Sequence, residues 1–332
     1  MQISVVVISY NSEKFLKRNL DSLVNQSVKF KQIIVVDNNS TDDSVKIIGR
    51  YARRHPQVLK IALDYNSGYA AGANIGIKKN RAGLLLVANA DIFLEMDFNK
   101  KIIEKFKSDK EIALLSPLIL RFDGKTVDSA GQTFSRALYP REIGFNKPAA
   151  AVPVQEGPVF SVCGAATVFR MEALEKLKIG EDYYDEDFYI FWEDFDIGWR
   201  ANLLGLKTIF YPEVVVYHFR SATLKRNFLS RFSLALSRSP VIKYHLVKNR
   251  YLTLIKNFRF KRFYGAIPFI IFKDIVWVGL LTLSAPKIII KLMRSTHYIK
   301  KAFKKRRIIK QRIEQKQAAS TSAADVTGKN NE

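Results

Sequence analysis

Two stretches near the start of the chain decide its fold: ISVVVISYNS at residues 3–12 and IIVVDNNS at residues 33–40. Each is a run of apolar, mostly β-branched residues that ends in Ser, Asn or Asp, which is typical of a buried strand ending at a turn. Similar runs occur at residues 58–63 and 84–87, and charged segments with helical spacing connect the first three runs. This alternation predicts an α/β fold with a doubly wound, mostly parallel sheet, whose ligands bind at the carboxyl ends of the strands.

Charge divides the 332 residues into two unlike parts. Residues 1–219 hold 28 Lys and Arg against 27 Asp and Glu, whereas residues 220–317 hold 25 against only Asp274 and Glu314, so the second part alone carries a net charge of +23. This asymmetry points to a polyanionic partner, anionic lipid or nucleic acid, for the second part only. The single cysteine, Cys163, excludes an intrachain disulfide and a Cys-rich zinc site, and it fits a reducing compartment.

Polar residues follow the predicted strands at the edge where ligands would bind. Asp37, directly after the second run, could accept a hydrogen bond from a base N–H or a ribose hydroxyl, although an ordinary helix cap explains it as well. Residues 64–76 are rich in Gly, Ala and Asn, and a helix beginning near Gly72 would offer its positive end to a diphosphate. The spacing matches neither the Walker loop nor the dinucleotide fingerprint, and close helix packing is the alternative explanation.

Two further clusters contain groups that could take part in chemistry. Asn89 and Asp91 end the fourth run, and an extended chain points both side chains to the same side, where they can share a hydrated divalent cation; an isolated pair of this kind is more often a turn. Glu193, Asp194 and Asp196 stand among large aromatic residues, where burial would raise a carboxylate pKa and prepare a general base. A lone histidine such as His218, after an apolar run, is more often structural unless other ligands converge on it.

In order and spacing, these clusters together resemble family 2 of the inverting glycosyltransferases, and in particular its rhamnosyltransferase-like branch. The resemblance covers about residues 3–220 and rests on residues 6–11, 36–40, 66–76, 89–91 and 192–194, with Arg200 and His218. It implies a catalytic domain of GT-A fold over residues 1–220, a nucleotide-diphosphate sugar donor and a divalent metal ion, Mg²⁺ or Mn²⁺. It also implies transfer to a hydroxyl of a saccharide or lipid-linked saccharide acceptor in cell-surface polysaccharide synthesis.

By the same resemblance, individual residues take roles. Asp194 is the expected general base, with Trp192 and Glu193 on the acceptor side, and Asp91 and His218 are the expected metal ligands. Donor contacts are expected from Ser9, Tyr10, Asn11, Asp37, Asn66, Gly68, Asn74 and Asn89. Asn89 departs from the family pattern, which begins its metal motif with an aspartate, although the rhamnosyltransferase-like branch often has Asn there. The branch favours dTDP-rhamnose as the donor, with a UDP-sugar as the alternative.

The C-terminal part has a different character. Residues 221–317 mix Lys and Arg with aromatic and aliphatic residues, which predicts a basic amphipathic helical region on an anionic membrane surface, and residues 318–332 are predicted to be disordered. The apolar run at 263–283 is long enough to span a bilayer, but Lys273 and Asp274 at its centre favour a kinked or re-entrant interfacial helix on the cytoplasmic face, with a true span as the alternative. We expect residues 1–219 to fold without this region.

Two other classes of function fit part of the pattern. The isoelectric point near 9.9 and the basic run at 304–307 suggest a nucleic-acid-binding protein, but the apolar content beside those charges favours a membrane surface. A nucleotidyltransferase shares the α/β plan and the use of metal. It would need a basic signature near the N-terminal glycine-rich turn, and none is evident.

Overall fold

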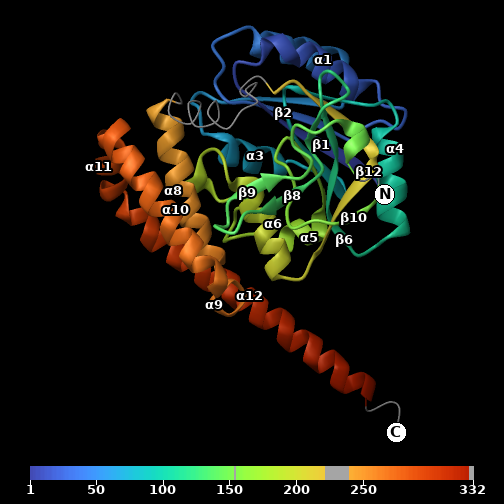
Figure 1. Ribbon diagram of the computed structural model, residues 1–332. Helices are drawn as coiled ribbons and strands as arrows, with labels where there is room; N and C mark the ends of the chain where they lie inside the picture. The colour runs from blue at the N-terminus through green and yellow to red at the C-terminus, as the bar shows by residue number, and fades with distance from the viewer. Residues whose placement is uncertain (153–154, 221–238, 329–332) are drawn as a thin grey trace.

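Strands and helices alternate in the N-terminal part of the chain, as the sequence predicts. The computed structural model describes residues 1–152, 155–220 and 239–328. In its first part the elements are β1 (Ile3–Ser9), α1 (Glu13–Val24), β2 (Ile33–Asp37), α2 (Ser44–Arg54), β3 (Val58–Ala62), α3 (Tyr69–Ile77) and β4 (Leu84–Asn89). β1 pairs in parallel with both β2 and β4, and β2 pairs in parallel with β3. Because these strands are parallel, the polar residues that follow them lie at one edge of the sheet. Figure 1 shows β1 and β2 between α1 and α3, which cover opposite faces of the sheet.

The sheet continues with strands of mixed direction. Its order is β10, β12, β6, β11, β4, β1, β2, β3, with β5 beside β12 and β7 beside β6. β6 and β12 are parallel to each other, and β11 joins them to β4 through antiparallel pairing on both sides. These strands are β5 (Ile92–Leu94), β6 (Ile112–Arg121), β7 (Val127–Ser129), β10 (Gly157–Pro158), β11 (Ala166–Arg170) and β12 (Lys207–His218). The predicted α/β class with a mostly parallel sheet is confirmed.

The connections between these strands supply a hairpin and three helices. The hairpin consists of β8 (Gln132–Phe134) and β9 (Pro140–Glu142), which pair only with each other among the described strands. The helices and 3₁₀ turns are α4 (Phe98–Ser108), η1 (Ala149–Ala151), α5 (Met171–Lys176), η2 (Glu186–Phe188) and α6 (Glu193–Leu203). The segment from η2 to α6 carries the acidic cluster that the sequence analysis singles out.

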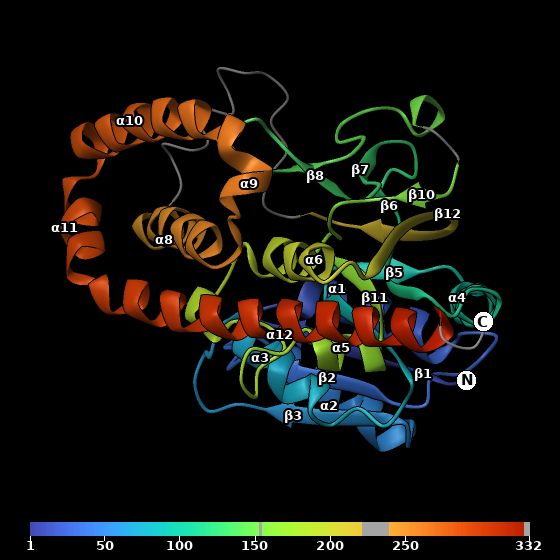
Figure 2. The same ribbon diagram turned by 90° about the horizontal axis from the view of Figure 1, so that it is seen from below.

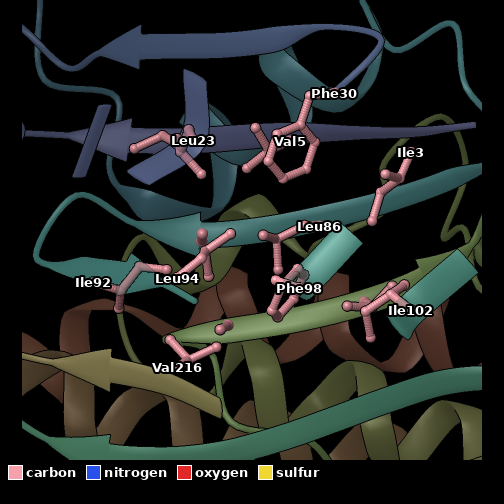
Figure 3. Packing of buried hydrophobic residues seen from close by; sticks show 14 of the residues in the cluster. Ile3, Val5, Leu23, Phe30, Leu86, Ile92, Leu94, Phe98, Ile102 and Val216 are labelled. Carbon is pink, nitrogen blue, oxygen red and sulfur yellow. The ribbon is translucent and has the colours of Figure 1, made fainter. Parts of the chain in front are cut away.

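Hydrophobic side chains cover both faces of the sheet. On one face, Val5 and Leu86 belong to the same buried cluster as Leu23 of α1 and Phe98 of α4 (Figure 3). Val6, the next residue of β1, belongs to the cluster on the other face, which α3 and α6 cover. Because successive side chains of a strand alternate between faces, burial on both sides explains why β1 is apolar throughout. The sheet edge is thereby fixed on a rigid core.

The described part of the C-terminal region is helical, as predicted. Its elements are α8 (Pro240–Asn257), α9 (Phe260–Phe263), η3 (Tyr264–Ala266), α10 (Ile267–Ser284), α11 (Pro286–Arg294) and α12 (Thr296–Gly328). Figure 2 shows α8 beside α6, with α10, α11 and α12 arranged around it. The helices thus form a layer against the side of the sheet domain that carries α6.

Two expectations for this region differ from the structure. α12 continues to Gly328, so residues 318–328 are helical where disorder is predicted; four of these residues are alanine, which has the highest helix propensity and readily extends a helix that is already formed. α8 is also no separate module, because the fully buried Lys256 forms ion pairs with Asp185 and Asp196. Residues 1–219 alone would lose this cation and would expose Phe195 and Trp199, which pack in one cluster with Leu254 of α8; this argues against independent folding.

α10 has two unlike faces. Asp274 pairs with Arg250 of α8 at 2.9 Å, and the ammonium of Lys273 lies 4.1 Å from the centre of the Tyr139 ring. On its outer side, Phe272 and Ile275 are 72% and 68% exposed. The stretch Phe260–Ser284 is long and apolar enough to cross a membrane, yet its two central charges contact the protein itself.

Candidate active site

Three of the expected residues converge where neighbouring strands end. In the parallel registers of β1 with β2 and β4, Ser9 lies beside Asp37 and Ile8 lies beside Asn89. The Ser9 hydroxyl donates a hydrogen bond to Asp37 Oδ1 at 3.3 Å. The predicted gathering of Ser9, Asp37 and Asn89 at one sheet edge is therefore confirmed.

The loops after β1 and β2 are tied together by hydrogen bonds. Asp37 is fully buried, and its two oxygens accept hydrogen bonds from the hydroxyl and the backbone N–H of Ser40 at 2.6 and 2.9 Å. Asn11 Oδ1 accepts a hydrogen bond from the backbone N–H of Thr41 at 2.8 Å. Tyr10 and Asn11 are exposed. A ligand can therefore reach Tyr10 and Asn11 directly, while Asp37 organises the loop behind them.

The glycine-rich segment is shaped mainly by packing. α3 begins at Tyr69 rather than near Gly72, and its first turn donates a hydrogen bond to the backbone oxygen of Tyr189. A Cβ atom at Gly76 would lie only 2.4 Å from a methyl of Val6, so this glycine lets α3 lie directly on β1. The helix therefore starts three residues before the expected position at Gly72, and close packing explains Gly76, while a contact of this segment with the diphosphate stays a prediction.

The remaining expected donor residues occupy different environments. Asn66 lies in the loop before α3, where its Oδ1 accepts a hydrogen bond from Gly68 N at 2.9 Å. Asn74 is fully buried; its amide nitrogen donates to Tyr184 O at 2.9 Å and to Glu186 Oε1 at 3.0 Å, and its oxygen accepts from Tyr184 N at 2.9 Å. The structure thus gives Asn74 the role of tying α3 to the segment before α6, in place of the expected donor contact.

Asp91 and His218 lie together, as predicted, although they are far apart in the chain. Asp91 follows β4, His218 ends β12, and Asp91 Oδ1 lies 3.2 Å from His218 Nε2. On the other side of the imidazole ring, His218 Nδ1 lies 2.7 Å from Asp128 Oδ2. Burial lowers the pKa of His218, but the hydrogen bonds to Asp128 and Asp91 outweigh burial and raise it to about 9.

This arrangement fits a pair of metal ligands. Two ligands held at right angles, each about 2.1 Å from a small divalent cation, lie about 3.0 Å apart, which is close to the observed 3.2 Å. A carboxylate that accepts the Nδ1–H bond is the usual support of a metal-binding histidine, because it leaves Nε2 to coordinate. The described residues contain no group of three or more His, Cys, Asp or Glu side chains arranged to hold a metal. A cation on this pair would therefore take its other ligands from water, from substrate or from an uncharged group such as the Asn89 amide, which lines the same cleft.

Asp194 lies in the first turn of α6 and is held by three N–H groups. Its Oδ2 accepts hydrogen bonds from Gly164 N at 2.8 Å and Gln132 Nε2 at 2.9 Å, and its Oδ1 accepts from Phe195 N at 2.8 Å. Burial raises the pKa of Asp194 above its ordinary value, and the hydrogen bonds offset burial only in part. A Cβ atom at Gly164 would lie 3.1 Å from this carboxylate, so the close approach of the backbone depends on the glycine.

Two neighbours of Asp194 that the sequence does not reveal come from the β8–β9 hairpin. Gln132 Nε2 also donates to Glu142 Oε1 at 2.9 Å, so that one amide connects the two carboxyl groups. Burial, with the negative charge of Asp194, raises the pKa of Glu142 to about 7. Strands of three residues give no periodic signal that could have revealed them.

The other acidic residues near Asp194 have different environments. Burial, together with the charge of Asp194, raises the pKa of Glu193 well above its ordinary value. Asp196 forms buried ion pairs with Arg200 and Lys256, both at 3.0 Å. Asp196 therefore has a structural role and is not a candidate for the general base.

These groups border one cleft of about 540 Å³. Of the expected residues, its lining includes Asn89, Asp91, Trp192, Glu193, Asp194 and His218. Asp128, Gln132 and Glu142 line it as well, and α8 contributes Leu246. The Asp91–His218 pair and the buried carboxylate of Asp194 thus face the same cleft. A group bound to a cation on this pair can therefore approach Asp194, the proton acceptor.

Two bacterial synthases are among the proteins to which the chain is similar in sequence. The chondroitin synthase of Escherichia coli is 25% identical over 144 residues, which cover 42% of this chain and 20% of that protein. The poly-β-1,6-N-acetyl-D-glucosamine synthase of Staphylococcus epidermidis is 23% identical over 215 residues, which cover 65% of this chain and 49% of that protein. The chain therefore spans half or less of the length of these two relatives.

A solved structure extends the likeness to nearly the whole chain. The mannosyltransferase PcManGT from Pyrobaculum calidifontis, in complex with GDP-Man and Mn²⁺, matches 96% of this chain and 86% of its own with a TM-score of 0.54 and 16% identity. At this identity the match supports the expected GT-A fold alone. The model of glycosyl transferase family 2 matches residues 4–178, a segment that includes β1, β2 and β4 and the residues at their ends, Ser9, Asp37, Asn89 and Asp91. The chain therefore belongs to glycosyl transferase family 2.

Proposed function

We propose that the protein transfers a sugar, with inversion at the anomeric carbon, from a nucleotide-diphosphate donor to a hydroxyl of a saccharide acceptor, and that Asp194 is the general base. The observation that carries the proposal is the common cleft. Asp194 and the Asp91–His218 pair line the same space, which holds both a proton acceptor and a place for the cation of a metal–diphosphate complex.

In the proposed reaction, Asp194 removes the proton from the acceptor hydroxyl. The hydroxyl oxygen forms a bond to the anomeric carbon while the bond from that carbon to the diphosphate breaks, and the bonding electrons leave with the phosphate oxygen. The N–H groups of Gly164 and Gln132 keep the carboxylate oriented. Burial raises the pKa of Asp194, which makes its carboxylate a stronger base than a solvated one.

Asp91 and His218 would hold the divalent cation, Mg²⁺ or Mn²⁺. Bound there, the cation would neutralise negative charge on the leaving diphosphate. His218 is oriented for this task by Asp128, which lies 2.7 Å from Nδ1. Asn89, beside this pair in the cleft lining, supplies an amide where the family pattern has a carboxylate, so fewer negative charges surround the cation.

For the donor we propose dTDP-rhamnose, with a UDP-sugar as the alternative. The resemblance of the Asn89–Asp91 element to the rhamnosyltransferase-like branch supports the first choice. The exposed Tyr10 and Asn11 are available to the nucleotide. Trp192 and Glu193, which line the cleft next to Asp194, would border the acceptor.

We also propose that α10 and α11 bind an anionic membrane at its cytoplasmic face, with a lipid-linked saccharide as the acceptor. The outer side of α10 exposes Phe269, Ile271, Phe272, Ile275, Val276, Val278 and Leu283. Because Lys273 and Asp274 contact Tyr139 and Arg250, a helix lying in the interface keeps these charges on protein, whereas a spanning helix would take them into hydrocarbon. An interfacial helix is therefore the proposed arrangement.

Internal pairing of the basic residues argues against nucleic acid as the partner. Lys256 and Lys305 both pair with Asp185, and Arg250 pairs with Asp274. Part of the positive charge that suggested a polyanion, including Lys305 of the basic run at 304–307, is thus paired with carboxylates of the protein itself and is not available for phosphate contacts.

The experiment that tests the proposed function is a thermal-shift screen of nucleotide sugars with and without Mn²⁺. A ligand that binds only the native state stabilises it by mass action and so raises the melting temperature. At a ligand concentration 100 times the Kd, the free energy of unfolding rises by about 2.7 kcal/mol. We expect dTDP-rhamnose or a UDP-sugar to shift the transition only when Mn²⁺ or Mg²⁺ is present. Absence of a shift with every nucleotide sugar, under conditions where the protein is folded, would contradict the proposal.

A further inference from the structure

The backbone just before Asp194 is held in an unusual conformation. Tyr189, Phe191 and Trp192 have φ angles of 65°, 68° and 75°, three left-handed residues with side chains within four positions. L-residues with bulky side chains rarely adopt this region, so such a run persists only where surrounding contacts impose it. The turn ends at Trp192, and α6 begins at the next residue with Glu193 and Asp194 in its first turn.

One side chain from the C-terminal region holds this turn. Asn249 of α8 is fully buried, and its Nδ2 lies 2.9, 2.7 and 2.8 Å from the backbone oxygens of Phe188, Ile190 and Phe191. The amide has two N–H groups, which the three carbonyls share. Buried carbonyl oxygens need donors, and here a residue nearly sixty positions away in the chain provides them.

α8 also contacts the residues on both sides of this turn, Asp185 before it and Asp196 after it. Lys256 forms ion pairs with Asp185, before the turn, and with Asp196, in α6 after it. Asn257 Nδ2 donates a hydrogen bond to Asp196 Oδ1 at 2.7 Å. The turn and the start of α6 are therefore fixed from outside by one helix, which Figure 2 shows lying beside α6.

We propose that Asn249 is a positioning residue for catalysis: it holds the 188–192 turn so that α6 presents Asp194 to the acceptor hydroxyl. This inference rests on the proposed role of Asp194 as base. It assigns to α8, outside the segment that matches the family model, a part in the catalytic apparatus. The C-terminal region would thus serve the reaction itself as well as a membrane.

The geometry explains how a distant amide controls the base. Asp194 meets Gly164 N and Gln132 Nε2 at 2.8 and 2.9 Å only while the start of α6 stays in place. Without the amide of Asn249, three carbonyls lose their donor and the turn can relax from its left-handed conformation. A displacement of about 1 Å at a reacting group costs on the order of 100-fold in rate.

The test compares two substitutions of Asn249 with a control in the same helical layer. Asn249→Leu keeps the volume and removes the donor, and Asn249→Ala removes both. Leu281→Ala is the control, because Leu281 is buried against the α8 and α11 side chains Tyr244 and Ile288 and belongs to no cluster with the turn. For each purified full-length protein, kcat, the KM for the donor, the Kd of the nucleotide and the melting temperature are measured with a soluble acceptor.

We expect both Asn249 variants to lose between about 10-fold and 100-fold in kcat at a temperature where they are folded, with the nucleotide Kd changed less than about two-fold. Leu281→Ala should keep kcat within about two-fold at a similar loss of melting temperature. Equal loss of kcat in the control, or an Asn249→Leu protein with normal kcat, would overturn the proposal. The variant Asp194→Asn separates the hypothesis that Asp194 is the base from the hypothesis that Asn249 positions the turn. If Asp194→Asn keeps its kcat while the Asn249 variants lose theirs, Asp194 is not the base and the turn positions another catalytic group.

Discussion

The buried ion pairs of Lys256 give the sharpest test of how the two parts of the chain depend on each other. We predict that Lys256→Met lowers the free energy of unfolding by about 3–5 kcal/mol, because removal of one partner from a buried pair leaves carboxylates in the interior without compensation. Lys256 and Asp196 are both fully buried, with Nζ and Oδ1 3.0 Å apart. At roughly 2 °C per kcal/mol for a large domain, the melting temperature should fall by about 6–10 °C.

The pH dependence of this effect has a definite sign. Burial raises the pKa of Asp185, but Lys256 and Lys305 outweigh burial and hold the pKa well below its ordinary value. A carboxyl with a lowered folded-state pKa contributes stability above its unfolded-state pKa and loses that contribution as pH falls through the folded-state value. The difference between Lys256→Met and the parent protein should therefore be largest at neutral pH and should narrow as the pH falls below the ordinary Asp value of 3.8, because the parent protein loses this contribution there.

The assay is thermal and urea unfolding followed by circular dichroism, at several pH values. Lys310→Met is the matched control, because Lys310 is largely exposed and, within the part of the chain that the structure describes, pairs only with Glu314 one helical turn away, at 3.4 Å. It should change stability by less than about 0.5 kcal/mol. A loss of less than about 1 kcal/mol for Lys256→Met would refute the reasoning, and residues 1–219 could then fold alone as the sequence suggested.

Three further predictions follow from the site and from α10. Asp91→Ala and His218→Ala should each raise the Mn²⁺ concentration needed for half-maximal activity, measured by metal titration after chelation; full activity in excess chelator would remove the metal role. The acid limb of the kcat/KM profile should lie above the ordinary Asp value of 3.8, because burial raises the pKa of Asp194 and the base must be ionised to act; a limb at or below that value would contradict this. Intact protein should float with anionic liposomes, partly released by 1 M salt and fully by detergent, whereas Phe272→Glu with Ile275→Glu should weaken flotation; unchanged flotation would refute an apolar contact through this face.

The sequence predicts the strand edge well because its signals are local. A continuous β-branched run has few alternatives to a buried strand, and parallel pairing then brings Ser9, Asp37 and Asn89 to the same edge. The proximity of Asp91 and His218 could also be predicted, but only through the family resemblance. No local pattern connects residues from β4 and β12.

The rest of the site depends on contacts between segments that show no local signal. Gln132 and Glu142 come from three-residue strands, and Asn249 is one of several polar residues in α8, with nothing in the sequence to distinguish it from the others. Counting charge by segment also misled the sequence analysis. It assigned all the C-terminal positive charge to an outside partner, whereas Lys256 and Lys305 pair with Asp185 of the N-terminal part.

The most direct test of the central claim is the transfer rate of Asp194→Asn, measured in single turnover with saturating donor and Mn²⁺ and accompanied by the Kd of the nucleotide. The substitution keeps the shape of the side chain and removes the base. We predict a loss of about 10²–10⁴-fold in the rate of the chemical step, with the nucleotide Kd nearly unchanged. A variant that transfers sugar within a few-fold of the parent rate would show that Asp194 is not the base, and Glu142, whose pKa burial raises to about 7, would be the next residue to substitute.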